Sequence, residues 1–248
     1  MFLHEKTYNL DELTAYNTHT HTNFSHCAKR EMVAADMIKE AEKSGIKVLA
    51  LTDNNYPDEK NQVAVQRLAL LKQIENIETD VKVLIGAELS SYDIGKFADD
   101  EECDNSLDWR LYTTNHFHQG YWVHPEDKSP RGYCRHMLAI MDKVIDSGRA
   151  DAFAHPFMAK YISCFDDFRV VTAAFTDNEI GDIMEKANQK EITWEINVPA
   201  VFGDPVFHKR YFGIGRETGA VFNIGTDAHK LCDIDVKQFI PELKRILY

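Results

Sequence analysis

Two histidines separated by one residue, His19 and His21, are the side chains of this sequence best placed to share a metal ion. They follow Ala15–Thr18, a short β-prone run. Alternate side chains of an extended strand point to the same side, so both imidazoles project together from the end of a strand. Imidazole is the commonest protein metal ligand, because it is neutral near pH 7 and keeps a lone pair. We expect the rest of the chain to bring further ligands to this pair.

Further metal-binding side chains follow short apolar runs along the chain. The predicted strands are Ala15–Thr18, Lys47–Thr52, Lys82–Ala87, Arg110–Thr114, Ala150–Ala154, Ile192–Asn197 and Ala220–Gly225. The polar residues at their carboxyl ends are His19, His21, Asp53, Glu88, His116, His155, Glu195, Asp227 and His229. Strands that alternate with helices form parallel sheets with right-handed crossovers. In a parallel barrel the carboxyl ends meet at one face, where active sites are built. The sequence therefore predicts an α/β fold, a closed or nearly closed barrel.

Amphipathic stripes at helical spacing predict the helices between these strands. They are Glu31–Ser44, Lys60–Asn76, Tyr133–Ser147, Asn178–Lys190, His208–Thr218 and a tail that begins at Asp235. Residues 1–14 are expected to be a loose lead-in, and residues 89–109 and 117–132 to be irregular. We find no internal repeat or linker, so residues 1–248 are expected to form a single domain.

Composition limits the classes of partner. The formal net charge is -12, which disfavours binding to extended nucleic acid. A small phosphorylated molecule remains compatible, because bound cations can reverse the sign locally. The chain has no apolar run that could span a bilayer, and residues 1–13 are too polar for a signal peptide. Five cysteines without a pairing pattern are typical of the reducing cytoplasm. The oligomeric state is not predicted.

An ordered set of motifs resembles the PHP family, the polymerase and histidinol phosphatase domains. The motifs are His19-Thr-His21, Leu51-Thr-Asp53, Gly86-Ala-Glu88, His155-Pro156 and Gly225-Thr-Asp227-Ala-His229, within residues 15–230. The resemblance implies a distorted seven-stranded β/α barrel, TIM-like, with two or three divalent metal ions. It implies one site of His19, His21, Glu88 and Asp227, and a second of Glu88, His116 and His155. Glu88 would bridge the two ions. His26, the residue after Asp53, and His229 would form a third site.

The sequence departs from the family at the third site. The family pattern is Thr-Asp-His, whereas this chain has Thr52-Asp53-Asn54. An asparagine offers only a neutral carbonyl oxygen, a poorer ligand than imidazole for borderline metals. We therefore expect Asn54 to be a weak ligand, and the third ion to be absent or easily removed.

The ligand set predicts the chemistry. Histidine and carboxylate ligands without cysteine suit zinc, manganese or iron. Two ions bridged by one carboxylate, about 3.5–4 Å apart, are used for in-line displacement at phosphorus with a metal-activated water. We therefore expect metal-dependent hydrolysis of a small phosphate ester, with Glu88, His155 and Asp227 as the catalytic residues. Neither Ser25 nor Cys27 is expected to form a covalent intermediate.

Other side chains are expected to support this centre. Asp53 and Glu195 are candidates for orienting the histidine ligands from behind. Arg131 and Lys160 are candidates for binding the phosphate, because both lie in loops after ligand positions. His4, His118, His124, His136 and His208 are expected to be packed or surface residues, with His118 the least certain because it could share a strand face with His116.

Three functions remain open at this point. A histidinol-phosphatase-like phosphatase is one, although nothing in the chain selects the histidinol end. A nuclease like the PHP domains attached to DNA polymerases is the second, and the net charge weighs against it. The third is a non-catalytic metal-binding module, which the Asn54 departure would allow.

Overall fold

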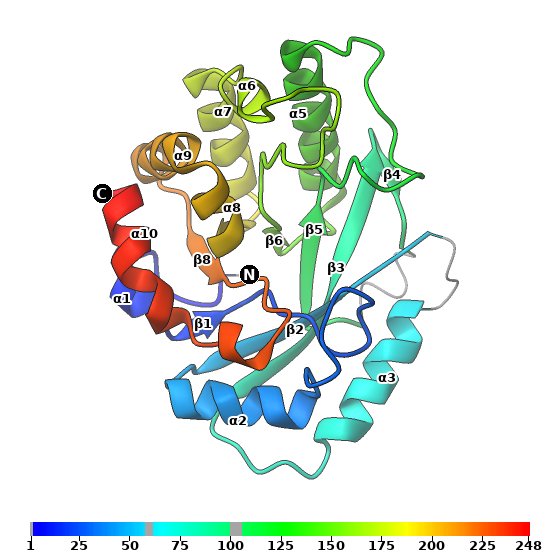
Figure 1. Cartoon of the computed structure of the whole chain (residues 1–248), viewed down its shortest axis with the longest axis vertical. Helices are drawn as coiled ribbons and strands as arrows, with labels where there is room; N and C mark the ends of the chain where they lie inside the picture. The colour runs from blue at the N-terminus through cyan, green and yellow to red at the C-terminus, as the bar shows by residue number, and fades with distance from the viewer. Residues whose placement is uncertain (1, 58–61, 100–105) are drawn as a thin grey trace.

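In the computed structural model, which describes residues 2–57, 62–99 and 106–248, seven parallel strands form a nearly closed barrel surrounded by helices (Figure 1). The strands are β1 (Tyr16–Asn17), β2 (Val48–Asn54), β3 (Lys82–Asp93), β5 (Trp109–Thr113), β6 (Ala152–Phe153), β7 (Thr193–Asn197) and β8 (Phe222–Gly225). Each pairs in parallel with the next, in the order of the chain. The backbone amide of Thr18, which directly follows β1, donates to the carbonyl of Ile224 in β8 at 3.1 Å. This contact brings the first and last strands together. The predicted barrel of seven parallel strands is confirmed.

The helices lie between and outside the strands. They are α1 (Leu10–Leu13), α2 (Ala34–Ser44), α3 (Gln62–Ile74), α5 (Pro130–Ser147), α6 (Arg169–Thr172), α7 (Asp177–Asn188), α8 (Val198–Gly203), α9 (Pro205–Thr218) and α10 (Ile240–Leu247). Two short 3-10 helices, Leu231–Asp233 and Val236–Phe239, precede α10. Among the described residues, no helix is both long enough and apolar enough to cross a membrane.

The alternation of side chains along the strands separates two cores. In β2, Leu49 and Leu51 belong to the large core between barrel and helices, whereas Val48 and Ala50 belong to a smaller core inside the barrel. Leu84 of β3 belongs to the inner core as well. Because side chains alternate with a period of two, Glu88 lies on the same face of β3 as Leu84, four residues further on. The barrel interior is therefore apolar at one end and carries Glu88 at the other.

The same alternation places polar groups of β7 inside the barrel. Trp194 and Ile196 of β7 belong to the outer core. The residues between and after them, Glu195 and Asn197, therefore face the interior, and both are buried. These inward carboxylate and amide groups lie at the carboxyl end of the barrel, as the strand pattern predicts.

Two expectations about the connections were wrong. The lead-in expected at residues 1–14 is not loose throughout, because α1 packs Leu10 and Leu13 into the core with no exposed surface. Residues 89–93 are not irregular, because β3 continues to Asp93 and pairs antiparallel with β4 (Lys96–Phe97). A helix that the sequence pattern did not predict, α8, begins directly after β7. Residues 100–105, part of the expected loop, lie outside the described residues, as do residues 60 and 61 of the expected second helix.

Candidate metal centre

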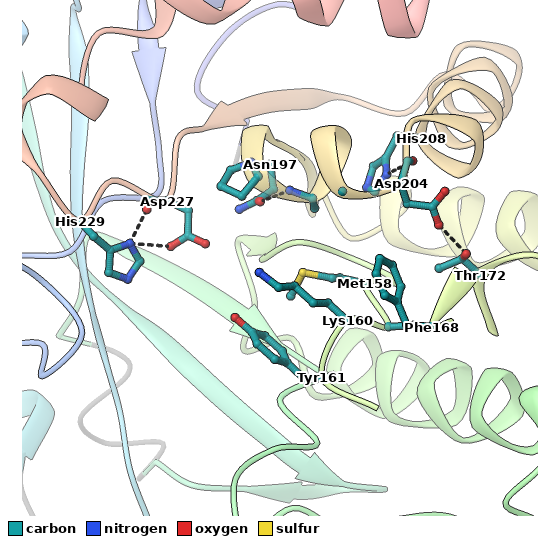
Figure 2. Close-up of a pocket in the computed structure, with 14 residues that line it drawn as sticks. Met158, Lys160, Tyr161, Phe168, Thr172, Asn197, Asp204, His208, Asp227 and His229 are labelled. Atoms are coloured by element: carbon teal, nitrogen blue, oxygen red, sulfur yellow. Dashed lines mark hydrogen bonds and ion pairs between the residues drawn. The ribbon is translucent and has the colours of Figure 1, made fainter. Parts of the chain in front are cut away.

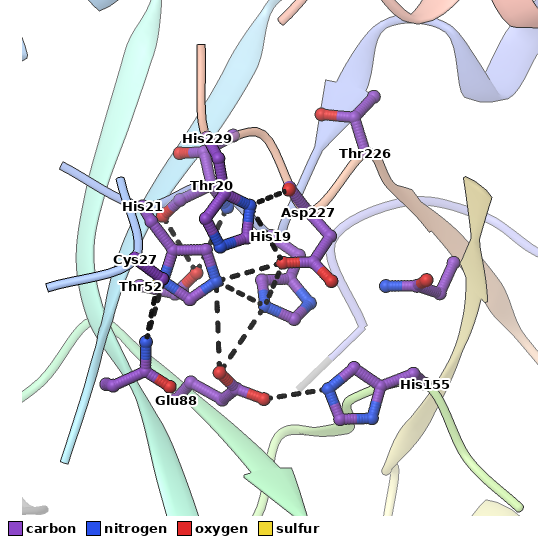
Figure 3. Close-up of polar contacts among 12 residues, drawn as sticks. His19, Thr20, His21, Cys27, Thr52, Glu88, His155, Thr226, Asp227 and His229 are labelled. Carbon is purple, nitrogen blue, oxygen red and sulfur yellow. Dashed lines mark hydrogen bonds and ion pairs between the residues drawn. The ribbon is translucent and has the colours of Figure 1, made fainter. Parts of the chain in front are cut away.

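Four ligand atoms converge at the carboxyl end of β1 (Figure 3). The Nε2 atoms of His19 and His21 lie 3.1 Å apart, and Asp227 Oδ1 lies 3.5 and 3.0 Å from them. Glu88 Oε2 is 3.7 Å from His19 Nε2 and 3.8 Å from His21 Nε2. Ligands about 2.0–2.1 Å from a tetrahedral ion lie about 3.3 Å from one another. These distances match that spacing, so the four side chains fit one divalent ion.

The other oxygen of Glu88 faces a second group. Glu88 Oε1 is 2.8 Å from His155 Nε2 and 3.5 Å from His116 Nε2. The rings of His116 and His155 lie 5.0 Å apart. One carboxylate thus places one oxygen toward each histidine group, as a bridge between two ions requires. His155 Nδ1 is buried and has no hydrogen-bond partner in the described chain.

The cluster contains buried carboxylates whose negative charge a bound cation would balance. Glu88 is 2 % exposed, and Glu195 is equally buried. Within the residues that the structure describes, the ion pairs of Glu88, Glu195 and Asp227 involve histidines and no lysine or arginine. Buried carboxylates are costly unless paired or bound to a metal. The donor set, histidine and carboxylate, suits zinc, manganese or iron.

The pKa values of His19 and Glu88 are shifted in opposite directions by the charges of the cluster. Burial lowers the pKa of His19, but the charges of Glu195 and Asp227 outweigh it and raise that pKa well above its usual value. Burial raises the pKa of Glu88, but the neighbouring histidines hold it well below its usual range. A cation bound at His19 Nε2 competes with a proton for the same lone pair.

His116 behaves differently from His19. Burial lowers the pKa of His116 to about 3, although the charge of Glu88 opposes this shift. The imidazole is therefore neutral and has a lone pair available for a metal at any physiological pH. Its 12 % exposed side chain sits at the mouth of the centre rather than beneath it.

Glu195 contacts two of the candidate ligands, His19 and His155. Its Oε1 accepts from His19 Nδ1 at 2.8 Å, and its Oε2 accepts from the backbone amide of His155. A carboxylate on the far nitrogen fixes the tautomer of a ligand histidine and leaves Nε2 for the metal. Gly225, the last residue of β8, makes room for this carboxylate, since a Cβ there would lie 1.7 Å from Glu195 Oε1.

Asp53 orders the loop after β1. Its carboxylate accepts from the Thr22 amide at 2.8 Å, from the Thr22 hydroxyl at 2.6 Å and from the Ser25 hydroxyl at 2.6 Å. Ser25 Oγ lies 3.3 Å from His21 Nδ1. Asp53 thus contacts His21, a candidate ligand, through one hydroxyl.

Two residues of the centre have strained backbones. His155 has φ 29° and Asp227 has φ 52°. Positive φ is uncommon for residues other than glycine and clusters at functional sites, where surrounding contacts hold it. The Asn115 amide, bonded to the His155 carbonyl at 2.8 Å, is one such contact.

The residues expected to form a third metal site, His26, Asn54 and His229, are not all brought together in the structure. His26 is exposed, with its ring 6.2 Å from that of Tyr56, and it does not line the cavity of the centre. Cys27 lines that cavity instead, together with Asn54 and His229. Asn54 Nδ2 lies 3.4 Å from Cys27 Sγ and 3.3 Å from His21 Nδ1. His26 and Cys27 are both exposed, but only Cys27 lines the cavity of the centre.

The two basic candidates differ. The Arg131 guanidinium, on α5, binds both oxygens of Glu179 and the Ala174 carbonyl. It is engaged between helices and lines neither the cavity of the centre nor the cavity that contains Lys160, so the structure does not support Arg131 as a phosphate ligand. Lys160 is exposed and lines a cavity that also contains Asp227 and His229, a position compatible with phosphate binding.

Two residues that the sequence pattern did not place at the centre line its cavity. His118 is exposed, as expected for a surface residue, yet it lines the cavity with its ring 5.4 Å from that of His116. Tyr161 stacks 4.0 Å from His118 and lines the same cavity. Asn197 ends β7 two residues after Glu195. The spacing His116-Phe-His118 was a usable signal, whereas Tyr161 and Asn197 had none. The other four histidines bond elsewhere: His4 to Asn223, His124 to Tyr133, His136 to the Val123 carbonyl and His208 to the Asp204 carbonyl.

Known proteins resemble this chain in sequence and in fold. A protein of Aliivibrio fischeri (strain ES114), named as a probable phosphatase, is 26% identical over 216 residues, which cover 86% of this chain and 77% of the relative. Histidinol phosphate phosphatase of Lactococcus lactis, solved with zinc, L-histidinol and phosphate, superposes with a TM-score of 0.59 and 15% identity, covering 91% of this chain and 92% of that one. A chain in the structure of archaeal ribonuclease P with mature tRNA gives a TM-score of 0.53 and 11% identity, over 93% and 83% of the two chains. No protein-family model matches the chain. The structural likenesses establish the fold: this chain shares the α/β barrel of histidinol phosphate phosphatase.

Proposed function

We propose that this protein is a metal-dependent phosphatase that hydrolyses a small phosphate monoester. The observation that carries the proposal is the Glu88 carboxylate, buried between two groups of imidazoles with one oxygen toward each. Two ions in that arrangement would bind the phosphoryl oxygens and activate water for attack on phosphorus. The name of the Aliivibrio relative and that of the Lactococcus neighbour support the same chemistry.

The protein's own residues would hold these ions and orient the ester. His19, His21, Asp227 and Glu88 are the proposed ligands of one ion, and Glu88, His116 and His155 those of the other. Tyr161 lies at the mouth, where burial raises the pKa of its hydroxyl to about 12. The hydroxyl therefore stays protonated and can donate a hydrogen bond to a phosphate oxygen. Lys160 supplies a positive charge beside it.

The first prediction tests this function directly. Protein purified without chelator should contain at least two divalent ions per chain and release phosphate from small monoesters. Chelation should stop the release, and zinc, manganese or iron should restore it, because the ions supply the nucleophile and bind the phosphate. Elemental analysis and a phosphate-release assay provide the measurements. A metal content near zero in folded protein would contradict the proposal.

The nuclease alternative is tested in the same experiment. Single-stranded oligonucleotides should be cleaved more slowly than monoesters at equal concentration, because the acidic chain repels a polyanion. Faster cleavage of the oligonucleotide would favour the nuclease function, and metal binding without either activity would favour a non-catalytic module.

The second prediction concerns the third ion. Cys27 is a poor ligand as a thiol, and burial, with the charges of Glu88 and Asp227, raises its pKa to about 11. Asn54 offers only a neutral carbonyl oxygen beside His229, so we expect this ion to be absent or removed by mild chelation. The variant Asn54→His should add one retained ion per chain. Metal content after mild chelation measures this, with Asn178→His, on the exposed start of α7, as the control for unspecific binding. Three firmly held ions in the natural protein would contradict the prediction.

A further inference from the structure

A second cavity, of about 230 Å³, adjoins the candidate metal centre. We call it the side cavity. Asp227, His229 and Tyr161 line both the side cavity and the cavity of the centre, so the two spaces meet at these residues. Figure 2 shows Asp227 and His229 at one end of the side cavity, with Asn197 and Lys160 between them and the far end. Polar groups of Asn197 and Lys160 therefore lie where they can reach a molecule bound at the centre.

Strand geometry places Asn197 closer to the mouth of the barrel than the groups that hold the histidines. Asn197 ends β7 two residues after Glu195, and both side chains are buried. Residues two apart on a strand share a face and lie about 7 Å from each other along it. Glu195 bonds to His19 Nδ1 and to the His155 amide, on the side away from the ligand nitrogens. Asn197 is therefore at the level where a molecule bound to the metal ions would lie.

One atom of Asn197 lacks a partner within the described chain. As the N-cap of α8, its Oδ1 accepts from the Ala200 amide at 3.0 Å, which fixes the orientation of the side-chain amide. Its Nδ2 is buried and has no hydrogen-bond partner among the described residues. In Figure 2 this nitrogen points toward Asp227. A buried donor is costly unless it is hydrogen-bonded, so this nitrogen indicates an acceptor that a bound molecule supplies.

The cap of α8 does not explain why this residue is an asparagine. Serine, aspartate and asparagine cap helices about equally well, because the cap uses a side-chain oxygen. Ser129 and Thr176 cap α5 and α7 in this way. At Asn9, which caps α1, the nitrogen is used as well, since it donates to Glu12 Oε1 at 3.0 Å. The nitrogen of Asn197 therefore has a role that the cap does not supply.

The surroundings of this nitrogen favour a phosphoryl oxygen as its acceptor. Lys160 lines the same cavity and extends toward the same end of it, so a charged donor and a neutral donor face one space. The nearest carboxylate, that of Asp227, directs its Oδ1 to His19 and His21. A phosphoryl group brings several strong acceptor oxygens, more than the metal ions alone engage. One of these oxygens can therefore satisfy the amide.

We propose that Asn197 binds the phosphoryl group of the substrate by donating from Nδ2 to a non-bridging oxygen. The proposal rests on the proposed phosphatase function. The contact to the Ala200 amide orients the donor before the substrate binds. Such preorganised donors stabilise the charge that develops on oxygen in the transition state, at no further cost of reorganisation. The amide keeps its protons throughout, so its contribution is binding and charge stabilisation.

The variant Asn197→Ser tests the donor, because serine keeps an oxygen for the cap of α8 but has no amide nitrogen. We expect it to lower kcat/KM for a small phosphate monoester by about 10–100-fold. The loss should be equal for an aryl phosphate and an alkyl phosphate, because both share the phosphoryl group. The inhibition constant of inorganic phosphate should rise by about tenfold or more. Metal content and thermal unfolding should match those of the natural protein.

Two further variants separate the donor from charge and from the cap. Asn197→Asp has nearly the same shape and caps the helix, and it should lose at least as much activity, because a carboxylate repels the phosphoryl oxygens. Asn9→Ser is the matched control, since it removes the nitrogen of an asparagine that caps α1. It should leave kcat/KM and the inhibition by phosphate unchanged.

The outcomes distinguish this proposal from the phosphatase function. If Asn197→Ser kept kcat/KM within about twofold, the donor would not contact the phosphoryl group, and charge alone would explain any loss in Asn197→Asp. A loss confined to one leaving group, or one that accompanies a fall in metal content, would equally overturn the phosphoryl contact. In each of these cases the phosphatase function stands. No release of phosphate from any monoester by the metal-loaded natural protein would overturn the proposed function itself.

Discussion

Replacement of Glu88 by glutamine should reduce phosphatase turnover on the order of thousandfold while leaving the barrel folded. Glu88 is ionised, since the neighbouring histidines hold its pKa well below the usual range despite burial. The amide has nearly the same shape but no charge. Two divalent ions about 3.5–4 Å apart would then repel each other with no anion between them. Loss of a two-metal centre removes several kcal/mol of transition-state stabilisation.

Turnover, metal content and thermal unfolding of Glu88→Gln should be measured together. We expect the variant to retain at least one ion fewer per chain and to unfold as cooperatively as the natural protein. The control is Glu242→Gln, which changes an exposed carboxylate paired with Arg245 and should leave turnover and metal content unchanged. Activity within about tenfold of the natural protein would show that Glu88 is not the bridge.

The barrel was predictable from the sequence because its signals are local. Each strand is a short apolar run, and the alternation of side chains with a period of two determines which residues face inward. The pair His19 and His21, and the inward-facing positions of Glu88 and Glu195, follow from that geometry. The structure brings these four side chains to one face.

The loops were less predictable because long-range contacts shape them. Whether His26 or Cys27 faces the cavity depends on the turn that Asp53 holds through Thr22 and Ser25, contacts that join residues about thirty positions apart. Arg131 looked available in the sequence, yet its partner Glu179 lies 48 residues away on another helix. No local pattern reveals such pairings.

The side cavity was missed for a related reason. Its walls come from residues 158–172, from α8 and from the start of α9, and these segments have no shared periodicity. Asn197 looked like an ordinary strand end in the sequence. Only the structure shows that its oxygen caps α8 while its nitrogen has no partner among the residues that the structure describes. From the residue type alone, an asparagine whose nitrogen is left for another contact cannot be distinguished from one that only caps a helix.

Replacement of Gly225 by alanine tests how closely β8 packs against the candidate metal centre. A methyl group at this position would lie 1.7 Å from Glu195 Oε1 and 2.7 Å from His19 Cβ. Both neighbours are buried and their side chains are bonded to each other, so neither can move without breaking that bond. Gly225→Ala should therefore lower the free energy of unfolding by about 2–4 kcal/mol, as overpacking and the loss of a buried network do. It should also lower metal content, because Glu195 would no longer hold His19 and His155.

Two variants separate the steric effect from the loss of the carboxylate. Glu195→Gln keeps the volume and should weaken metal binding by about 10–100-fold with a smaller change in stability. Gly213→Ala, in α9, adds the same methyl group where no atom lies within 4 Å, and should be neutral or stabilising because alanine favours the helix by about 1 kcal/mol. Denaturant unfolding and elemental analysis of the three variants provide the measurements. If Gly225→Ala kept the stability and metal content of the natural protein, β8 would have to yield at this position, and Glu195 would not be held by the close packing described here.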